Sequence, residues 1–273
     1  MTINGDIDEL TRIIKHCGDM ARNARTHKLV AWEKADSTPV TEADIAIDKY
    51  LQETLMAMKP DYGWLSEESE DNLNRLNAQH LWVVDPIDGT RAYARGDDDY
   101  CISIGLLENN KPILGMLYVP DHDDLYLAIK GQGSFKNGKT LSMPSLDSLR
   151  DKTMIGDGDY FKSARTWPTP WPDSMNYEQA NSLALRHAWV AEGKGDVVVT
   201  ANPKCDWDLA AASLIITEAG GHSGDHQGAD YQFNQENPRH FPVVACHQDL
   251  LASVEKRLSP ALALRKERRL DKF

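Results

Sequence analysis

The 273-residue sequence predicts a mixed α/β protein, because its apolar residues follow both helical and strand-like patterns. Apolar residues three and four positions apart predict helices near both ends and in the middle of the chain. Short apolar runs bounded by turn residues predict strands, most densely over residues 81–130. This length corresponds to one large domain or two closely fused ones. We expect two halves, 1–147 and 148–273, that meet in a loop-rich stretch.

The N-terminal half begins with two predicted helices. Residues 10–25 have helical spacing, and a polar loop over 32–40 separates them from a second helix that runs from Thr41 to about Met58. Thr41 and Asp44 have the spacing of a capping box, in which each side chain binds the backbone N–H of the other residue. Capping is therefore one role open to Asp44, and catalysis is the other.

Four apolar runs predict strands in the same half. The first covers Leu81 to Val84 and is expected to stop at Asp85-Pro86, because proline donates no backbone hydrogen bond. Residues 69–80, just before it, predict a polar and exposed connection. Three further strands, linked by turns, are expected over 101–107, 113–119 and 124–130.

The C-terminal half alternates helices and strands. The expected elements are a helix over 182–192, a strand over 196–200, a helix over 209–219, a strand over 241–246 and a helix over 249–270. The helix over 209–219 is rich in small residues that allow close packing. It ends at Gly220-Gly221, a pair typical of a helix C-terminus.

Composition limits the classes of function. A net charge of −12 disfavours nucleic-acid binding, and we interpret the basic run Arg265-Lys266-Glu267-Arg268-Arg269 as a solvated helix face. No apolar run reaches the length of a membrane span, and the first residues lack the pattern of a signal peptide. The four cysteines are far apart in the sequence, which disfavours a zinc site or a disulfide scaffold and is typical of a cytoplasmic protein.

The segment Asp85-Pro86-Ile87-Asp88-Gly89-Thr90 carries the clearest chemical signal. Its two carboxylates follow a buried strand, and carboxylate oxygens are ligands that Mg²⁺ prefers. Gly89 and Thr90 stand where a helix is expected to begin, and backbone N–H groups at a helix start bind phosphate. Taken alone, the segment could also be an ordinary polar turn.

Three other acidic segments accompany it. Each has a structural explanation of its own: capping for Asp44, surface exposure for Glu67 and Glu68, and compensation of the helix dipole for Asp208. The segments are Thr41-Glu42-Ala43-Asp44, Glu67-Glu68-Ser69 and Trp207-Asp208-Leu209-Ala210-Ala211. Together with the segment around Asp85, and in this order, they resemble the inositol monophosphatase superfamily of metal-dependent, lithium-sensitive phosphatases.

The resemblance covers residues 32–221 and implies both a fold and an activity. The fold would be a layered αβαβα sandwich of the type also found in fructose-1,6-bisphosphatase, with an α+β N-terminal half and an α/β C-terminal half. The active site would lie between the halves, with Asp208 supplied by the second. The activity would be Mg²⁺-dependent hydrolysis of a phosphate monoester.

The resemblance also implies a set of metal ligands. Glu67, Asp85 and the backbone carbonyl of Ile87 resemble the ligands of one Mg²⁺. Asp85, Asp88 and Asp208 resemble those of a second, with Asp85 bridging the two ions. Whether a third Mg²⁺ binds stays open. Two Mg²⁺ about 4 Å apart would neutralise the phosphate, acidify the attacking water and stabilise the leaving oxygen.

The remaining catalytic roles follow from the same resemblance. Asp44 and Thr90 resemble the pair that orients and deprotonates the attacking water, and Glu67 is counted with them as catalytic. Thr90 can accept one hydrogen bond and donate another, so it can pass the proton of the water toward Asp44. The N–H groups of Gly89 and Thr90 would hold the phosphate.

The substrate depends on residues around this centre. Inositol monophosphatases usually have an acidic residue seven positions before the Trp-Asp aspartate, where this chain has Ala201. Many relatives have a glycine before the serine at position 182, where this chain has Asn181. Both differences put the substrate in question, and the first predicts that inositol phosphate is hydrolysed poorly.

Several side chains could instead hold a second phosphate. Candidates for contacts to the substrate are Arg91, Ser182, Arg186 and Lys204; for the three cations, surface charge is the alternative. Residues 64–68, 111–115 and 204–208 resemble bacterial 3′(2′),5′-bisphosphate nucleotidases of the CysQ type. This resemblance implies hydrolysis of 3′-phosphoadenosine 5′-phosphate to AMP.

Other functions stay open. The substrate could be inositol 1-phosphate or another small monoester such as histidinol phosphate or a sugar phosphate. The alternative from another class is a non-catalytic regulatory protein that keeps the fold, and the complete set of acids disfavours it. We expect a small phosphorylated metabolite as partner, with no nucleic acid and no membrane span. The resemblance also raises the expectation of a homodimer.

Overall fold

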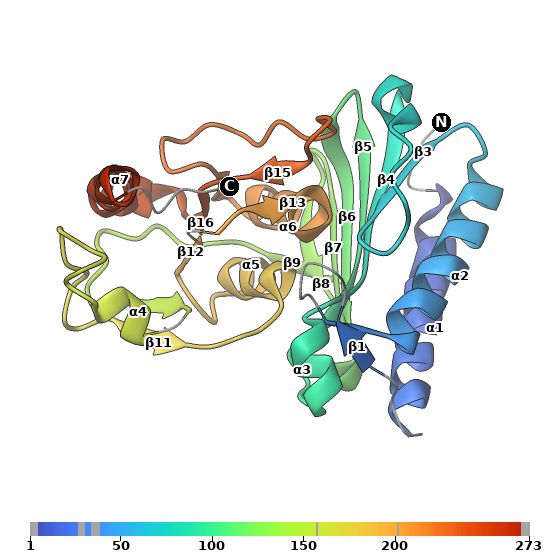
Figure 1. The fold of residues 1–273 in the computed structure, drawn as a ribbon, viewed down its shortest axis with the longest axis horizontal. Coiled ribbons are helices and arrows are strands. Elements are labelled where there is room, and N and C mark those ends of the chain that lie inside the picture. Colours follow the sequence, from blue (N-terminus) through green and yellow to red (C-terminus); the bar gives the residue numbers. More distant parts are fainter. Residues whose placement is uncertain (1–4, 27–30, 34–38, 157, 201, 269–273) are drawn as a thin grey trace.

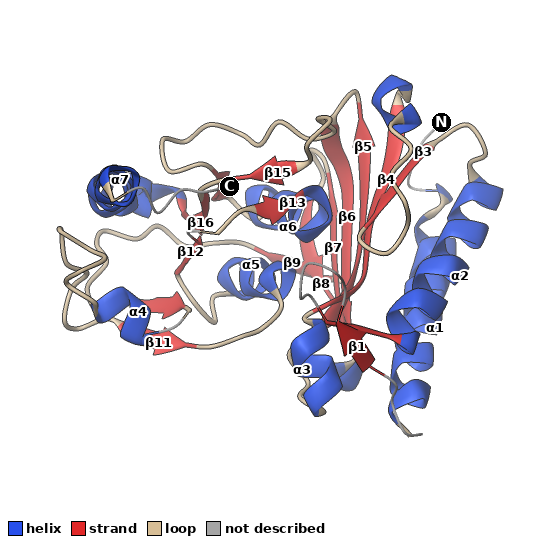
Figure 2. Cartoon of the chain, viewed as in Figure 1, coloured by secondary structure: helices blue, strands red, loops and turns tan. Residues whose placement is uncertain are grey.

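The computed structural model describes residues 5–26, 31–33, 39–156, 158–200 and 202–268. Layers of helix and sheet alternate across it (Figures 1 and 2). Helices α1 and α2 cover one face of a seven-stranded sheet, and α5 and α6 pack between that sheet and a five-stranded one. Helix α7 and the aromatic residues around α4 cover the outer face of the five-stranded sheet. The predicted layered αβαβα fold is therefore confirmed.

The helices have these bounds: α1 Ile7–Arg25, α2 Glu42–Met58, α3 Thr90–Arg95, α4 Gly158–Lys162, α5 Leu183–Glu192, α6 Asp206–Glu218 and α7 Leu251–Glu267. The strands of the first two sheets are β1 Ala31–Glu33, β2 Pro39–Thr41, β3 Gly63–Ser66, β4 His80–Asp88, β5 Cys101–Glu108, β6 Lys111–Val119, β7 Asp124–Ile129, β8 Gly133–Lys136 and β9 Lys139–Leu141. The remaining strands are β10 Thr153–Ile155, β11 Asn176–Glu178, β12 Val197–Thr200, β13 Lys204–Cys205, β14 Gly221–Gly224, β15 Arg239–His240 and β16 Val243–His247.

The seven-stranded sheet has the order β3-β4-β5-β6-β7-β8-β9, and only the β3–β4 pair is parallel. Its residues alternate between two cores, because successive side chains of a strand point to opposite faces. Trp82 and Val84 pack with α1 and α2, whereas Val83 packs with α5 and α6. Because both faces are covered by helices, the strands consist largely of apolar residues.

The prediction that the first strand stops at Asp85-Pro86 is wrong, because β4 continues to Asp88. Its pairing with β5 changes register between Asp85, which lies opposite Ser103, and Asp88, which lies opposite Cys101. Proline has no N–H to donate, and this irregular stretch is where a strand tolerates it. The register change leaves two aspartates close together at the end of one strand.

Helix α6 packs unusually close to the seven-stranded sheet. A Cβ atom placed on Gly115 would lie 2.5 Å from the carbonyl oxygen of Ala211, and one on Gly105 would lie 2.9 Å from Cβ of Ala210. The small residues that the sequence analysis noted in this helix therefore meet glycines on the sheet. This contact fixes the height of α6 above the strands and, with it, the position of the helix start.

The five-stranded sheet has the order β11-β10-β12-β16-β14 and lies within residues 153–247. Sequence patterns predicted only β12 and β16 of this sheet, because the other strands have three or four residues each and lie among turns. The seven-stranded sheet lies within residues 63–141. We keep the division into halves at residues 147 and 148 as a proposal.

Two other local expectations need correction. Part of the expected loop over 32–40 pairs as the short antiparallel strands β1 and β2, while residues 34–38 lie outside the described part of the chain. The expected exposed connection over 69–80 contains a 3₁₀ helix, Asn74–Asn77, in which Arg75 is buried.

All four cysteines are free thiols. Among the described residues, no helix is both long and apolar enough to cross a membrane.

Candidate active site

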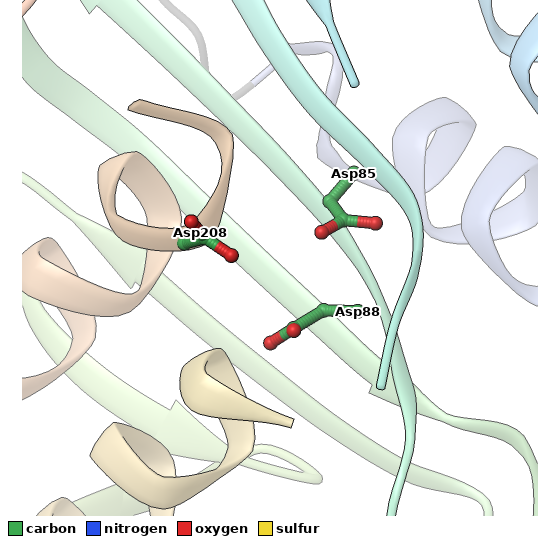
Figure 3. Close-up of side chains that lie close together, drawn as sticks. All are labelled: Asp85, Asp88 and Asp208. Carbon is green, nitrogen blue, oxygen red and sulfur yellow. The ribbon is translucent and has the colours of Figure 1, made fainter. Parts of the chain in front are cut away.

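Three aspartates from the two halves of the chain converge on one point (Figure 3). Asp85 and Asp88 come from the end of β4, and Asp208 comes from the first turn of α6. Each offers a carboxylate oxygen, and these atoms all lie within 4.8 Å of one another. Such a group of hard oxygen donors is the kind of site that binds Mg²⁺.

Backbone N–H groups fix one oxygen of Asp85 and one of Asp88. Asp85 Oδ1 accepts a hydrogen bond from the N–H of Ile87 at 3.0 Å. Asp88 Oδ2 accepts from the N–H of Ala184 at 2.6 Å and from the Ser182 hydroxyl at 2.7 Å, so the N-terminus of α5 holds it. This arrangement restrains both side chains while their second oxygens can bind a ligand.

Capping boxes fix one oxygen of Asp208 and one of Asp44 in the same way. Each residue is the third of its helix, and its Oδ2 accepts from the N–H of the N-cap residue: Cys205 at 2.7 Å for α6 and Thr41 at 2.8 Å for α2. The other oxygen of Asp44, Oδ1, lies 3.2 Å from Thr90 Oγ1. Capping and catalysis are therefore compatible for Asp44, since they use different oxygens.

Burial is the main cause of raised pKa values in three of these acids. Burial raises the pKa of Asp85 well above its usual value, and the neighbouring charges of Glu67 and Asp88 raise it further. Burial also raises the pKa of Asp208 to about 7, although the nearby charge of Lys204 opposes the shift. The pKa of Asp44 is raised by burial, with hydrogen bonds from Thr41 and Thr90 opposing it.

The donor set fits a divalent metal ion. Asp85 Oδ2 is buried and has no hydrogen-bond partner among the described residues, which is costly for a carboxylate oxygen unless a cation lies beside it. Bound cations would also remove the mutual repulsion that raises the pKa of Asp85. The orphan oxygen and the oxygen-only ligands thus both point to a hard cation such as Mg²⁺.

Glu67 approaches the three aspartates from a turn after β3. Its N–H donates to the carbonyl of Val84 at 3.4 Å, which places the turn beside β4. Its charge is the largest contribution from any neighbouring acid to the raised pKa of Asp85. Glu67 therefore lies near Asp85, although it is not one of the three acids whose oxygens lie within 4.8 Å of one another, and its role as a metal ligand stays a prediction.

A buried aspartate that the sequence patterns did not single out holds this turn. Asp48 is buried on α2, and its two oxygens accept hydrogen bonds from the hydroxyls of Ser66 and Ser69, each at 2.5 Å. These serines flank Glu67 and Glu68. A sequence signal was present, because Asp48 follows Asp44 by one helical turn and therefore lies on the same face of α2.

Thr90 and Gly89 begin α3 beside the acids. Thr90 Oγ1 lies 3.0 Å from the carbonyl of Ile87 as well as near Asp44, so its hydroxyl has two acceptors for one proton. Gly89 has φ 98°, and a Cβ there would lie 3.0 Å from the carbonyl oxygen of Asp99. Only glycine fits this conformation and this close approach without strain.

The predicted contacts to the substrate differ in their surroundings. Ser182 is fully buried and bonded to Asp88, so it supports the acid cluster. Arg186 donates from Nε to the carbonyl of Ala180 at 2.7 Å. Burial lowers the pKa of Arg186, and the charges of Asp88 and Asp99 offset only part of this shift.

The other two predicted contacts are less buried. The charge of Lys204 acts to lower the pKa of Asp208, so Lys204 lies near that residue. Arg91 is exposed in the first turn of α3. Asn181 donates from its N–H and its side-chain amide to Asp99, at 2.5 and 2.8 Å. The prediction for Ala201 concerns a residue outside the described part of the chain.

The layered fold and its acidic centre define a class of metal-dependent phosphatases. The model of the inositol monophosphatase family matches residues 6–263, so the chain belongs to this family. Members of the family are phosphatases that depend on metal ions, and the present chain is a phosphatase that acts on phosphate monoesters. The predicted membership of the inositol monophosphatase family is therefore confirmed.

Individual relatives agree on the family and differ in the substrates that they are named for. An inositol monophosphatase of Dictyostelium discoideum is 31% identical over 240 residues, which cover 84% of this chain and 87% of that protein. The 3′(2′),5′-bisphosphate nucleotidase CysQ of Escherichia coli K12 is 27% identical over 227 residues, covering 81% and 91%. The crystal structure of the extragenic suppressor protein suhB from Bartonella henselae has a TM-score of 0.79 at 25% identity, covering 92% and 97%.

Proposed function

We propose that this phosphatase uses two Mg²⁺ ions held by Glu67, Asp85, Asp88, Asp208 and the carbonyl of Ile87. The observation that carries the proposal is the convergence of three carboxylates, each with one oxygen fixed by a backbone N–H. The carbonyl of Ile87 has two lone pairs, so it can bind a metal while it accepts the Thr90 hydrogen bond. A rigid, acidic and oxygen-rich centre is what a reaction with an anionic substrate requires.

The side chains around this centre then divide the chemistry. Bound cations would supply the positive charge that neutralises the phosphate and acidifies a water molecule. Thr90 Oγ1 would accept a hydrogen bond from that water and so orient it for attack. Its own proton would move toward Asp44 Oδ1, 3.2 Å away. Burial raises the pKa of Asp44, and a raised pKa suits a carboxylate that must accept a proton.

Gly89 and Thr90 would hold the phosphate itself. They lie at the start of α3, and the position of Gly89 leaves no room for a larger residue. Backbone N–H groups at such a start favour an anion. The phosphorus would then lie between these N–H groups and the oriented water.

For the substrate we propose 3′-phosphoadenosine 5′-phosphate. Support comes from two cations that lie near the acids. The charge of Lys204 acts to lower the pKa of Asp208, and the charge of Asp88 acts to raise the pKa of Arg186. A second phosphate on the substrate would give these cations a partner. Inositol 1-phosphate is the second candidate, favoured by the 31% identical inositol monophosphatase.

A comparison of the two substrates tests this choice. We expect kcat/KM to be higher for 3′-phosphoadenosine 5′-phosphate than for inositol 1-phosphate. Lys204→Ala should raise KM for the bisphosphate by roughly 10- to 100-fold, because a hydrogen bond to a charged group contributes about 1.5–3 kcal/mol. Lys194→Ala is the matched control. Lys194 pairs with Glu192 at the C-terminal end of α5, whereas Asp88 contacts the N-terminal end of this helix.

Two results would contradict the proposed substrate. One is a preference for inositol 1-phosphate. The other is a Lys204→Ala variant that binds the bisphosphate as tightly as the wild type. Both would leave the proposed metal chemistry intact.

Lithium sensitivity is a further expectation. Li⁺ is small and hard, so it can occupy an oxygen-lined Mg²⁺ position without supplying the same charge. We expect LiCl at roughly tens of millimolar, a range suited to a weak hard-cation ligand, to inhibit phosphate release more than KCl at the same ionic strength. Equal rates in the two salts would count against this expectation.

A further inference from the structure

A buried polar cluster outside the acidic centre connects the two halves of the chain. At its middle lies Arg75, which is only 2% exposed. Its guanidinium donates to both oxygens of Asp71 at 2.7 to 3.1 Å. It also donates to Asn234 Oδ1 at 2.7 Å and to the carbonyl of Gln235 at 3.0 Å. Asp71 follows Glu67 by four residues along the chain, so the cluster begins in the segment that carries one proposed metal ligand.

Asn234 extends the cluster toward α6. Its side-chain amide donates to the carbonyl of Arg75 at 3.2 Å and to Asn110 Oδ1 at 2.8 Å. Its backbone N–H donates to Asp206 Oδ2 at 2.7 Å. Asn234 has φ 59°, a left-handed conformation in which asparagine is enriched. Both the conformation and the bonds therefore select asparagine at this position.

Asp206 completes the path to the second half of the site. It is the first residue of α6, two positions before Asp208, and it is fully buried. Its Oδ1 lies 2.6 Å from His240 Nε2, and its backbone N–H donates to the carbonyl of Pro238 at 3.0 Å. These bonds fix the first helical turn, which carries Asp208.

We propose that Asp71, Arg75, Asn234 and Asp206 form a connector that positions Glu67 relative to Asp208 and thereby sets the affinity of the site for divalent cations. The inference rests on the proposed two-metal function. The connector residues are positioning residues, because they act through the ligands. The planar guanidinium of Arg75 donates to three residues at once, which the single ammonium of lysine does not reproduce.

Substitution of Arg75 tests the connector. Arg75→Lys keeps the positive charge but loses the fork of hydrogen bonds. We expect its Kd for Mn²⁺, measured from the electron paramagnetic resonance signal of the free ion, to rise about 10-fold or more. This is the usual scale for residues that support metal ligands. The Mg²⁺ concentration for half-maximal phosphate release should rise by a similar factor, with a smaller change in kcat at saturating Mg²⁺.

Two further variants separate positioning from folding. Asp71→Asn changes the partly exposed end of the connector, so it tests the same path with less risk to folding. Lys136→Met is the matched control. Lys136 bridges Asp124 and Glu192 and so also joins the seven-stranded sheet to α5, but at the end of α5 away from Asp88. We expect all three variants to lower the melting temperature and only the two connector variants to weaken Mn²⁺ binding.

Wild-type affinity for Mn²⁺ in both Arg75→Lys and Asp71→Asn would overturn the connector, as would an equal loss of affinity in Lys136→Met. Asp85→Asn distinguishes this failure from a failure of the proposed function. If Asp85→Asn loses Mn²⁺ binding while Arg75→Lys keeps it, only the connector is overturned. If Asp85→Asn binds Mn²⁺ like the wild type, the metal site is overturned and the connector's role with it.

Discussion

Asp85→Asn is expected to lower kcat at least about 100-fold at saturating Mg²⁺. Asp85 is the proposed bridging ligand, and metal ions contribute several kcal/mol of transition-state stabilisation in such sites. The same substitution should raise the melting temperature of the metal-free protein. It removes a buried charge that faces Glu67 and Asp88 and whose Oδ2 has no hydrogen-bond partner among the described residues. Function and stability should thus change in opposite directions.

The pH dependence of the metal-free protein follows from the same charges. The folded-state pKa of Asp208 is raised to about 7, whereas its value in the unfolded chain is about 3.9. The unfolded chain therefore releases this proton first, and the stability of the folded state falls as pH rises from about 4 to 7. Asp85 acts in the same direction, because its pKa is also raised. Asp85→Asn should therefore stabilise the metal-free protein more at neutral pH than at pH about 4.

Glu192→Gln is the matched control for Asp85→Asn. Burial raises the pKa of Glu192, but hydrogen bonds from Lys136 and Tyr126 outweigh it, and the net pKa is lowered. Its charge therefore stabilises the fold, and its removal should lower the melting temperature without lowering kcat. The measurements are phosphate release with Mg²⁺ and thermal unfolding with a chelator. Near-normal turnover of Asp85→Asn would contradict the proposed bridging ligand.

The second large effect is expected at Thr90. Thr90→Ala should lower kcat by roughly 100-fold or more, the lower end of the usual contribution of general acid–base catalysis. Its hydroxyl lies 3.2 Å from Asp44 Oδ1 and is the proposed path for the proton of the attacking water. Thr90→Ser keeps the hydroxyl and should retain most of the activity. Steady-state kinetics should show the loss in kcat, with KM little changed.

Asp44→Asn separates the two roles of Asp44. The amide oxygen of asparagine can still accept the hydrogen bond from the N–H of Thr41, so the cap of α2 should persist. The loss of a proton acceptor should lower kcat to a similar extent as Thr90→Ala. If Asp44→Asn only lowered the melting temperature and kept kcat, Asp44 would be a capping residue alone.

Much of the fold was predictable because the patterns that specify it are local. Helix α2 has a periodic apolar face, α5 and α6 are mostly apolar segments with recognisable starts or ends, and β5, β6 and β7 are apolar runs bounded by turns. The strands that escaped prediction have two to four residues each, which is too short for a recognisable pattern. The extension of β4 through Pro86 also escaped, because a register change absorbs the missing N–H.

The acids of the site were predictable for a similar reason. Each lies within a short motif near the end of an element, as Asp85 does in the last residues of β4 and Asp208 does in the first turn of α6. Their supporting partners were not predictable, because hydrogen-bond partners distant in sequence leave no periodic pattern. Asp48 meets Ser66 across 18 residues, and Arg75 meets Asn234 across 159. Such pairs are found only when the fold has brought them together.

The most direct test of the central claim is anomalous X-ray diffraction from crystals of the protein grown with Mn²⁺ in place of Mg²⁺. We predict anomalous difference peaks beside the facing oxygens of Asp85, Asp88 and Asp208, with Asp85 in contact with two of them. Hard divalent cations such as these bind oxygen ligands at short, well-defined distances, so a bound ion would be located unambiguously. The absence of any peak at these three carboxylates would contradict the account.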